Sequence, residues 1–158
     1  MKRTDAGSSM AIIGELNVDL IATGLAAMPA LGHEILAADF QMVLGSASAI
    51  FACGAARLGH PVTFISQVGK DDFGSFCLAE LKKAGVRTNR VRQTSEHQTG
   101  VTISLSTQRD RALVTFLGAI AEFDRWQVPL NALRGHSHLH LTSYFLQHRL
   151  RPTFPGIL

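Results

Sequence analysis

The chain has 158 residues, of which 46% are hydrophobic and 17% charged, and its formal net charge is +3. This length suits one compact domain, and the composition excludes a disordered or highly charged chain. No apolar run reaches the about 20 residues that a membrane-spanning helix needs. The basic residues form no single face with interleaved aromatic residues, so we expect no membrane and no nucleic acid as a partner.

Residues 1–10 are polar and lack the apolar segment of a signal peptide, so we interpret them as a disordered tail of a cytoplasmic protein. The two cysteines, Cys53 and Cys77, lie in apolar helical patterns. The sequence alone leaves a disulfide between them open. Buried free thiols, as in a cytoplasmic protein, are the favoured interpretation.

The first predicted strand covers residues 11–13, an apolar run typical of a strand buried on both faces of a parallel sheet. Residues 18–21 are interpreted as its continuation. After a turn at Pro29 and Gly32, residues 36–44 alternate between apolar and polar side chains. This alternation predicts a half-exposed strand or hairpin, whose apolar side needs a ligand or another subunit as its partner.

A helix is predicted next, over the alanine-rich residues 47–58. Ser46 or Ser48 can cap it by accepting a backbone N–H bond, and Gly59 suits the position after its end. Residues 62–68 then form a second predicted core strand.

A second helix begins at Asp71 or Asp72, has apolar residues at spacings of three and four, and ends before Gly85. Strand and helix therefore alternate along this part of the chain. That order predicts an α/β fold with a parallel sheet and right-handed crossovers.

Further strands are predicted over residues 101–105 and 112–117. The polar residues 108–111 between them indicate a hairpin turn, so this pair should be antiparallel. Residues 122–133 are predicted to be partly helical, and residues 138–145 to form a last strand.

Four motifs occur in an order that is specific although each is weak alone. They are Gly14-x-x-Asn17-x-Asp19, Pro29-x-x-Gly32, the Gly45-Ser46 turn before a helix closing with Ala56-Arg57-Leu58-Gly59, and Val68-Gly69-x-Asp71-x-Phe73-Gly74. Over about residues 11–118 the chain resembles the ribokinase-type (PfkB) carbohydrate kinases. The resemblance implies an α/β, Rossmann-like three-layer ribokinase fold that is partial, with a small β-sheet lid. Residues 11–158 would be the N-terminal part of this domain.

The resemblance implies an ATP-dependent kinase that uses Mg²⁺ and phosphorylates an alcohol group of a sugar or nucleoside. It assigns binding of this acceptor to Asn17, Asp19, Gly45 and Ser46. A carboxylate such as that of Asp19 can accept two sugar hydroxyls in charge-assisted hydrogen bonds, and a glycine turn lets the backbone approach the ligand. Alternatively, Asp19 binds backbone amides at a strand end and Asn17 serves a local turn.

Residues 33–44 resemble the lid of this family, which covers the sugar, excludes water and often forms a contact between subunits. We therefore expect a homodimer through the lid. The chain departs from the family pattern at Ser46, usually Gly, and at Ile50, usually an Asn that binds sugar. The apolar Ile50 suggests a less polar surface facing the substrate.

The family's glycine-rich anion hole, catalytic Asp and nucleotide site lie in its C-terminal half, and this chain has no Gly-Ala-Gly-Asp stretch. We expect that half to be absent, no catalytic residue in this chain, no tight binding of ATP or Mg²⁺, and little or no turnover from the chain alone. The alternatives are a non-catalytic ligand-binding or dimerisation module, and a truncated gene remnant.

Two further clusters have a ligand-binding interpretation that is less favoured. The turn at residues 69–74 could cradle a phosphate, but a strand-to-helix turn capped by Asp71 is the simpler interpretation. His136, His138 and His140 would share one face of a strand. Their side chains would lie about 6–7 Å apart along it, which makes one shared zinc ion awkward, so no metal site is expected.

Overall fold

The structure is a computed structural model of the chain that describes residues 9–157. The tail predicted for residues 1–10 lies outside these residues except at its end. There the prediction is wrong, because strand β1 (Met10–Ile13) already begins at Met10. The Met10 N–H donates a hydrogen bond to the carbonyl of Pro61 at 2.8 Å, and the carbonyl of Ser9 accepts one from the N–H of Ser137 at 3.0 Å.

Four parallel strands form the main sheet, in the order β5-β4-β1-β8. The strands beside β1 are β4 (Val62–Gly69), β5 (Arg87–Thr94) and β8 (His138–Leu141). The central strands are buried on both faces, since Ile12, Ile13, Phe64 and Ile65 are all fully buried. The predicted parallel sheet is thus confirmed, and its short apolar runs are those of strands covered on both sides.

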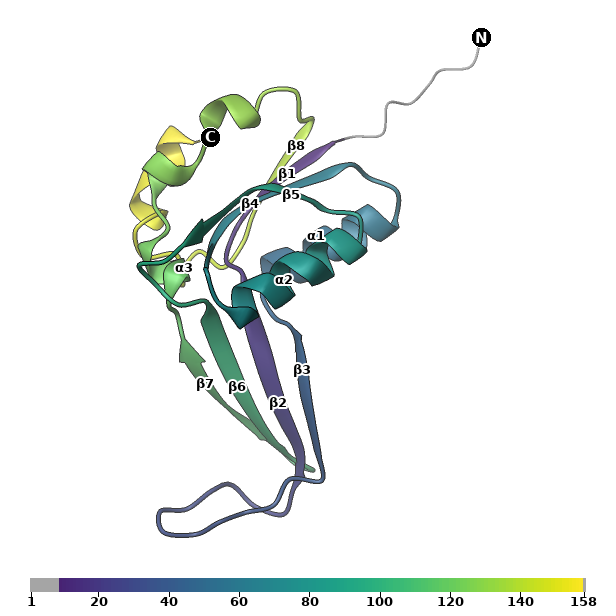
Figure 1. Cartoon of the computed structure of the whole chain (residues 1–158), viewed down its shortest axis with the longest axis vertical. Helices are drawn as coiled ribbons and strands as arrows, with labels where there is room; N and C mark the ends of the chain where they lie inside the picture. Colours follow the sequence, from purple (N-terminus) through teal and green to yellow (C-terminus); the bar gives the residue numbers. More distant parts are fainter. Residues whose placement is uncertain (1–8, 158) are drawn as a thin grey trace.

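Two helices, α1 (Ala47–Arg57) and α2 (Asp72–Lys83), lie side by side on one face of the main sheet (Figure 1). Between them and the sheet lies a core that includes Ile12, Phe64 and Leu81. The small residues of α1 face this core, which lets the helix lie close to the strands.

Short helical segments cover the other face, which makes the fold three-layered. They are α3 (Ala119–Glu122) and the 3₁₀ segments η1 (Arg125–Gln127), η2 (Leu130–Ala132) and η3 (Arg151–Gly156). Phe123, Leu150 and Phe154 pack here with Ile13 and Ile65. The partial helix predicted for residues 122–133 is confirmed.

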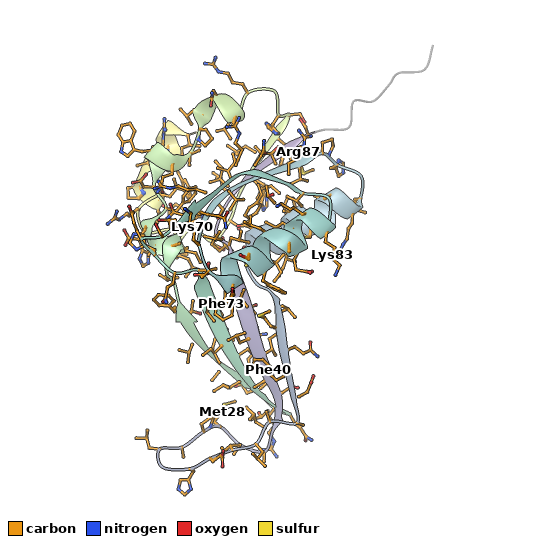
Figure 2. All side chains as sticks on the ribbon, viewed as in Figure 1. Met28, Phe40, Lys70, Phe73, Lys83 and Arg87 are labelled. Atoms are coloured by element: carbon orange, nitrogen blue, oxygen red, sulfur yellow. The ribbon has the colours of Figure 1, made fainter. Side chains whose placement is uncertain are left out.

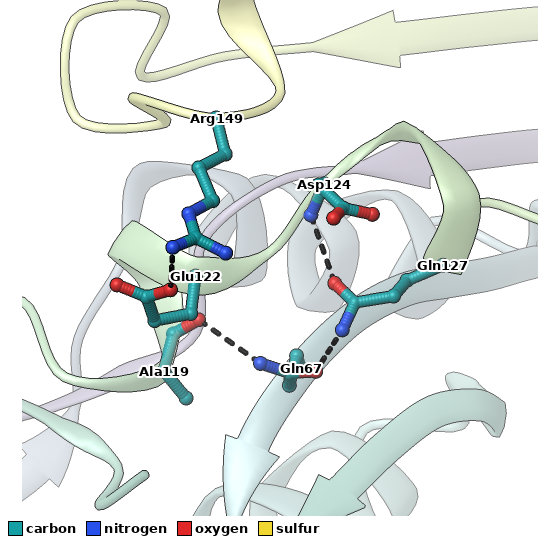
Figure 3. A network of polar contacts seen from close by, with 6 residues as sticks. All are labelled: Gln67, Ala119, Glu122, Asp124, Gln127 and Arg149. Carbon is teal, nitrogen blue, oxygen red and sulfur yellow. Dashed lines mark hydrogen bonds and ion pairs between the residues drawn. The ribbon is translucent and has the colours of Figure 1, made fainter.

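A chain of polar contacts ties these segments to β4, as Figure 3 shows. The Gln67 side chain donates to the carbonyl of Ala119 at 3.3 Å and accepts from the Gln127 amide at 2.7 Å. Gln127 in turn accepts from the N–H of Asp124 at 2.8 Å. The buried Gln67 is therefore satisfied on both sides of its amide, as a polar group in a core must be.

A second sheet extends away from the helices (Figure 1). Its strands are β2 (Asn17–Leu25), β3 (Asp39–Leu44), β6 (Gly100–Thr107) and β7 (Arg111–Phe116), in the order β3-β2-β6-β7. The predicted antiparallel pair is β6 and β7. The pairing of β2 with β6 is parallel and joins residues about 80 positions apart in the chain.

Three predicted strands differ from the observed ones. Residues 18–21 do not continue β1: they belong to β2, which enters the other sheet after a break at Gly14, because β2 has polar side chains on one face and cannot be buried on both. Only residues 39–44 of the alternating stretch form a strand. The predicted last strand, residues 138–145, is too long, since β8 ends at Leu141 and the chain turns at Ser143, whose φ is 53°.

None of the helices within residues 9–157 combines the length and apolar character that a membrane crossing requires.

Candidate functional site

A cleft of about 490 Å³ lies where the second sheet meets the carboxyl ends of β1 and β8. Its walls come from six places in the chain: the turn after β1, one face of β2, the turn before α1, β6, β7, and the segment after β8. Ligands of open α/β sheets bind at this end of the strands. Asn17, Asp19 and Ser46, three of the four residues assigned to acceptor binding, line the cleft.

The fourth, Gly45, lies directly against Asn17 and Asp19. Its N–H donates to the carbonyl of Asn17 at 2.9 Å. A Cβ atom added to Gly45 would lie 2.3 Å from Asp19 Oδ1 and 2.6 Å from Asn17 Nδ2, closer than any such contact tolerates. The turn therefore needs glycine because these side chains occupy the space beside it.

Asp19 is held by a single side-chain donor: Asn17 Nδ2 donates to Asp19 Oδ1 at 2.9 Å. Within the described residues Asp19 accepts no backbone N–H, so the alternative of a strand-end turn does not describe it, and Oδ2 has no protein partner. Burial raises the pKa of Asp19 above its ordinary value, and the bond from Asn17 offsets part of this. Asp19 thus presents an oxygen to the cleft that is free to accept a hydroxyl.

Asn17 connects Asp19 to the neighbouring strand. It is buried, with 6% of its surface exposed, and its Nδ2 also lies 3.4 Å from Thr102 Oγ1 and 3.3 Å from the carbonyl of Val18. Thr102 Oγ1 is 3.1 Å from Thr115 Oγ1 on β7. A row of polar side chains therefore crosses β2, β6 and β7 on the face that lines the cleft.

Ser46 has a structural task in the same place. Its hydroxyl donates to the carbonyl of Glu15 at 2.6 Å and accepts from the N–H of Ala49 at 3.0 Å, so it caps α1 as predicted. Its φ of 77° is one that glycine adopts more easily. Because the hydroxyl proton is used in this way, the side chain of Ser46 shapes the wall of the cleft and offers no free donor to a ligand.

Ile50 does not line the cleft. Its side chain is 60% exposed and borders a separate hollow with Leu44 and Cys53. Ile50 therefore does not contribute to the surface of this cleft, and the helical position three residues earlier, Ala47, is the one that reaches it.

Several residues that line the cleft were not assigned to a site from the sequence. They include Glu15, Thr102, Arg111 and Thr115. Glu15 is 3% exposed, and its Oε2 accepts from the hydroxyl of Ser48 at 2.8 Å. The alternation of side chains along β6 and β7 indicated that Thr102 lies on the same face of its strand as the residues two positions away, and the same holds for Thr115. Only the register with β2 shows that this face is the one that carries Asp19.

The turn at residues 69–74 is the helix cap that the simpler interpretation predicted. The Asp71 carboxylate accepts from the N–H of Gly74 at 2.7 Å and from the N–H and hydroxyl of Thr99 at 2.8 and 2.6 Å. Burial alone would raise the pKa of Asp71, but these bonds outweigh it and hold the pKa below its ordinary value. A carboxylate thus fills the turn, where a phosphate would meet like charge.

Two of the three histidines contact different neighbours. The ring of His140 stacks on Phe51 with centroids 3.8 Å apart, and His136 Nε2 lies 3.0 Å from the hydroxyl of Thr63. Across residues 9–157 no group of three or more His, Cys, Asp or Glu side chains is arranged to hold a metal ion. Cys53 and Cys77 are buried free thiols, as favoured, and burial raises the pKa of Cys77 to about 12.

Comparison with known proteins shows which proteins the chain is similar to. The model of the pfkB family carbohydrate kinases matches residues 8–153. Ribokinase of Bacillus subtilis (strain 168) is 32% identical over 111 residues, which cover 70% of this chain and 38% of that protein. The 2-dehydro-3-deoxygluconokinase of the same organism is 34% identical over 114 residues, covering 70% and 35%. The chain thus spans less than two fifths of the length of these relatives.

Solved structures agree. Arabidopsis thaliana ribokinase complexed with ribose and ATP superimposes with a TM-score of 0.77 at 21% identity, over 85% of this chain and 45% of that one. A putative ribokinase II from E. coli gives 0.75 at 25% identity, over 85% and 43%. These similarities confirm the predicted partial ribokinase-type fold. With the family model matching most of its length, the chain belongs to the pfkB family of carbohydrate kinases.

Proposed function

We propose that the chain forms the acceptor-binding part of an ATP-dependent kinase that phosphorylates an alcohol group of a sugar or nucleoside. The observation that carries this proposal is the unpartnered Oδ2 of Asp19, a residue that lines the cleft together with several hydroxyl-bearing side chains. Asp19 would accept one or two hydroxyls of the acceptor. Asn17 would hold the carboxylate in place through the 2.9 Å bond to Oδ1.

The names of the relatives support a sugar-like acceptor. Two of them are called ribokinase and 2-dehydro-3-deoxygluconokinase, and the Arabidopsis structure holds ribose and ATP. We propose ATP with Mg²⁺ as the phosphate donor on the same basis. The turn at residues 69–74 does not fit the phosphates of a nucleotide, because the Asp71 carboxylate fills it, and no transfer step is assigned to residues of this chain.

We propose that the second sheet acts as the lid of this site. One face of it carries Asp19, Thr102 and Thr115 toward the cleft. A bound sugar on this face would be shielded from water, which otherwise competes with the sugar hydroxyl for the phosphoryl group.

The opposite face of the second sheet suits a contact with a second copy of the chain, and we propose a homodimer through it. Leu20 and Leu44 at its inner end pack against the core below α1 and α2. Other side chains of this face are apolar and exposed. They include Phe40 at 63%, Val114 at 61%, Phe116 at 53%, Met42 at 41% and Ile103 at 41%. Phe40 lies on the sheet well away from both helices (Figure 2).

Two free buried thiols agree with a reducing compartment, and we propose that the protein is cytoplasmic.

Calorimetric titration of the full chain with D-ribose and with gluconate tests the role of Asp19. For whichever sugar binds more tightly, Asp19→Ala should weaken binding by more than about tenfold, since hydrogen bonds to a charged group are lost. Asp39→Ala is the matched control, because Asp39 lies on the same sheet and is exposed, and its carboxylate accepts a hydrogen bond from the side chain of Gln41 on the same strand. Unchanged affinity in Asp19→Ala would remove Asp19 from the site.

A further inference from the structure

The cleft has a cationic end that the assigned acceptor residues do not use. Three charged side chains line it: Glu15, Asp19 and Arg111. Glu15 is buried and accepts a hydrogen bond from Ser48, and Asp19 accepts one from Asn17. Arg111 is the one cation among the lining residues, and it stands at the start of β7.

The strand register places Arg111 on the inner face of the second sheet. Side chains two apart on a strand point the same way, so Arg111 shares a face with Thr115. Thr115 pairs with Thr102, and Thr102 pairs with Asp19. Arg111 thus belongs to the same surface as Asp19. Arg109 does not, since it borders a separate hollow at the tip of the sheet with Gly24–Met28.

The guanidinium of Arg111 is available to a ligand. Among residues 9–157 the ion pairs are Lys83 with Glu80 and Arg149 with Glu122, and neither involves Arg111. Its neighbour Asp110 accepts from the backbone N–H of Arg111 at 2.7 Å, so that bond leaves the side chain free. Arginine is the residue best suited to bind a carboxylate or phosphate through two parallel hydrogen bonds.

Arg111 and Asp19 are far enough apart to bind opposite ends of one molecule. Arg111 is four residues along β7 from Thr115, which stands level with Asp19, and four residues of strand span about 13 Å. Part of this span is covered by the arginine side chain itself. A ligand that touches both must present hydroxyls at one end and a negative group at the other.

We propose that the cleft selects sugars that carry an anionic group, a carboxylate or a phosphate, and that Arg111 is the residue that determines this specificity. The inference rests on the proposed function, because it takes the Asp19 cleft as the acceptor site.

Calorimetry of the full chain with gluconate, glucose 6-phosphate and glucose tests the proposal. At least one of the two anions should bind more than about tenfold more tightly than glucose, as expected for a charged hydrogen-bonded pair. A preference for gluconate identifies a carboxylate as the anionic group, and a preference for glucose 6-phosphate identifies a phosphate. Added salt should reduce the preference, because the arginine is exposed.

Three variants locate the effect. Arg111→Gln should lower the affinity for the preferred anion to about that for glucose, and Arg111→Lys should keep part of the preference. Arg109→Gln, which removes the same charge from the same hairpin, should retain the full preference. Equal affinity for the three sugars, or loss of the preference in Arg109→Gln as well, would overturn the anion specificity assigned to Arg111 but not the proposed acceptor site. If none of the three sugars binds, both the anion specificity and the proposed function fail.

Discussion

At the scale of single residues, the candidate site depends on how closely the backbone approaches two side chains. Gly45 leaves no room for a Cβ atom beside Asp19 and Asn17, and its N–H holds the carbonyl of Asn17. The position of the Asp19 carboxylate is therefore determined by a neighbour that contributes no side chain. Ser46 next to it caps α1 and keeps the turn in place.

Gly45→Ala should weaken sugar binding by about tenfold or more, because the new methyl group would displace the Asp19 carboxylate or open the turn. Titration calorimetry measures the loss, and circular dichroism reports whether the fold persists. Gly54→Ala is the control: Gly54 lies within α1 with nothing within 4 Å of an added Cβ, so the exchange should leave binding unchanged and raise stability slightly. Wild-type affinity in Gly45→Ala would show that this close approach does not position the site.

At the scale of elements, the sequence predicted the strands and helices that have a strong period of their own. The apolar runs of β1 and β4 and the capped helices α1 and α2 belong to this class. The sheet that lines the cleft was harder to predict from the sequence. Its central pair, β2 and β6, joins distant segments in parallel, and no local pattern specifies such a partner or its register.

The same limit explains which residues of the candidate site could be assigned from the sequence. Asn17, Asp19, Gly45 and Ser46 lie in motifs of the resemblance, so their assignment needed no knowledge of the sheets. Thr102, Thr115 and Arg111 reach the cleft only through the pairing of β6 and β7 with β2. Ile50 shows the converse, since a position taken from the motif alone lies outside the cleft.

The outer face of the second sheet leads to a prediction about assembly. Val114→Asp places a charge on the exposed apolar face, at the edge strand β7. The charge should disrupt a dimer contact through this face, and the folded monomer should tolerate it because the site is exposed. Analytical ultracentrifugation should find the wild-type chain dimeric and this variant monomeric. Leu58→Asp makes the same kind of change at a residue that is 81% exposed at the end of α1, and it should remain dimeric. A monomeric wild-type chain at concentrations well above micromolar would contradict the dimer.

At the scale of the whole molecule, two sheets with different environments meet at one cleft. The central strands of the main sheet are buried on both faces and form the base of the molecule. Glu15 and the segment after β8 reach the cleft from the carboxyl end of this sheet. The second sheet has one polar and one apolar face. The proposed function requires such an arrangement, in which the main sheet holds the acceptor site in place and the second sheet covers it.

The most direct test of this account is an amide NMR titration of the isotope-labelled chain with D-ribose and then with gluconate. The account predicts saturable shifts at Asn17, Asp19, Gly45 and Thr102 with at least one of the two sugars, and their loss in Asp19→Ala. A well-dispersed spectrum that shows no shift at these amides with either sugar, or shifts confined to other parts of the chain, would contradict the claim that this cleft binds the sugar.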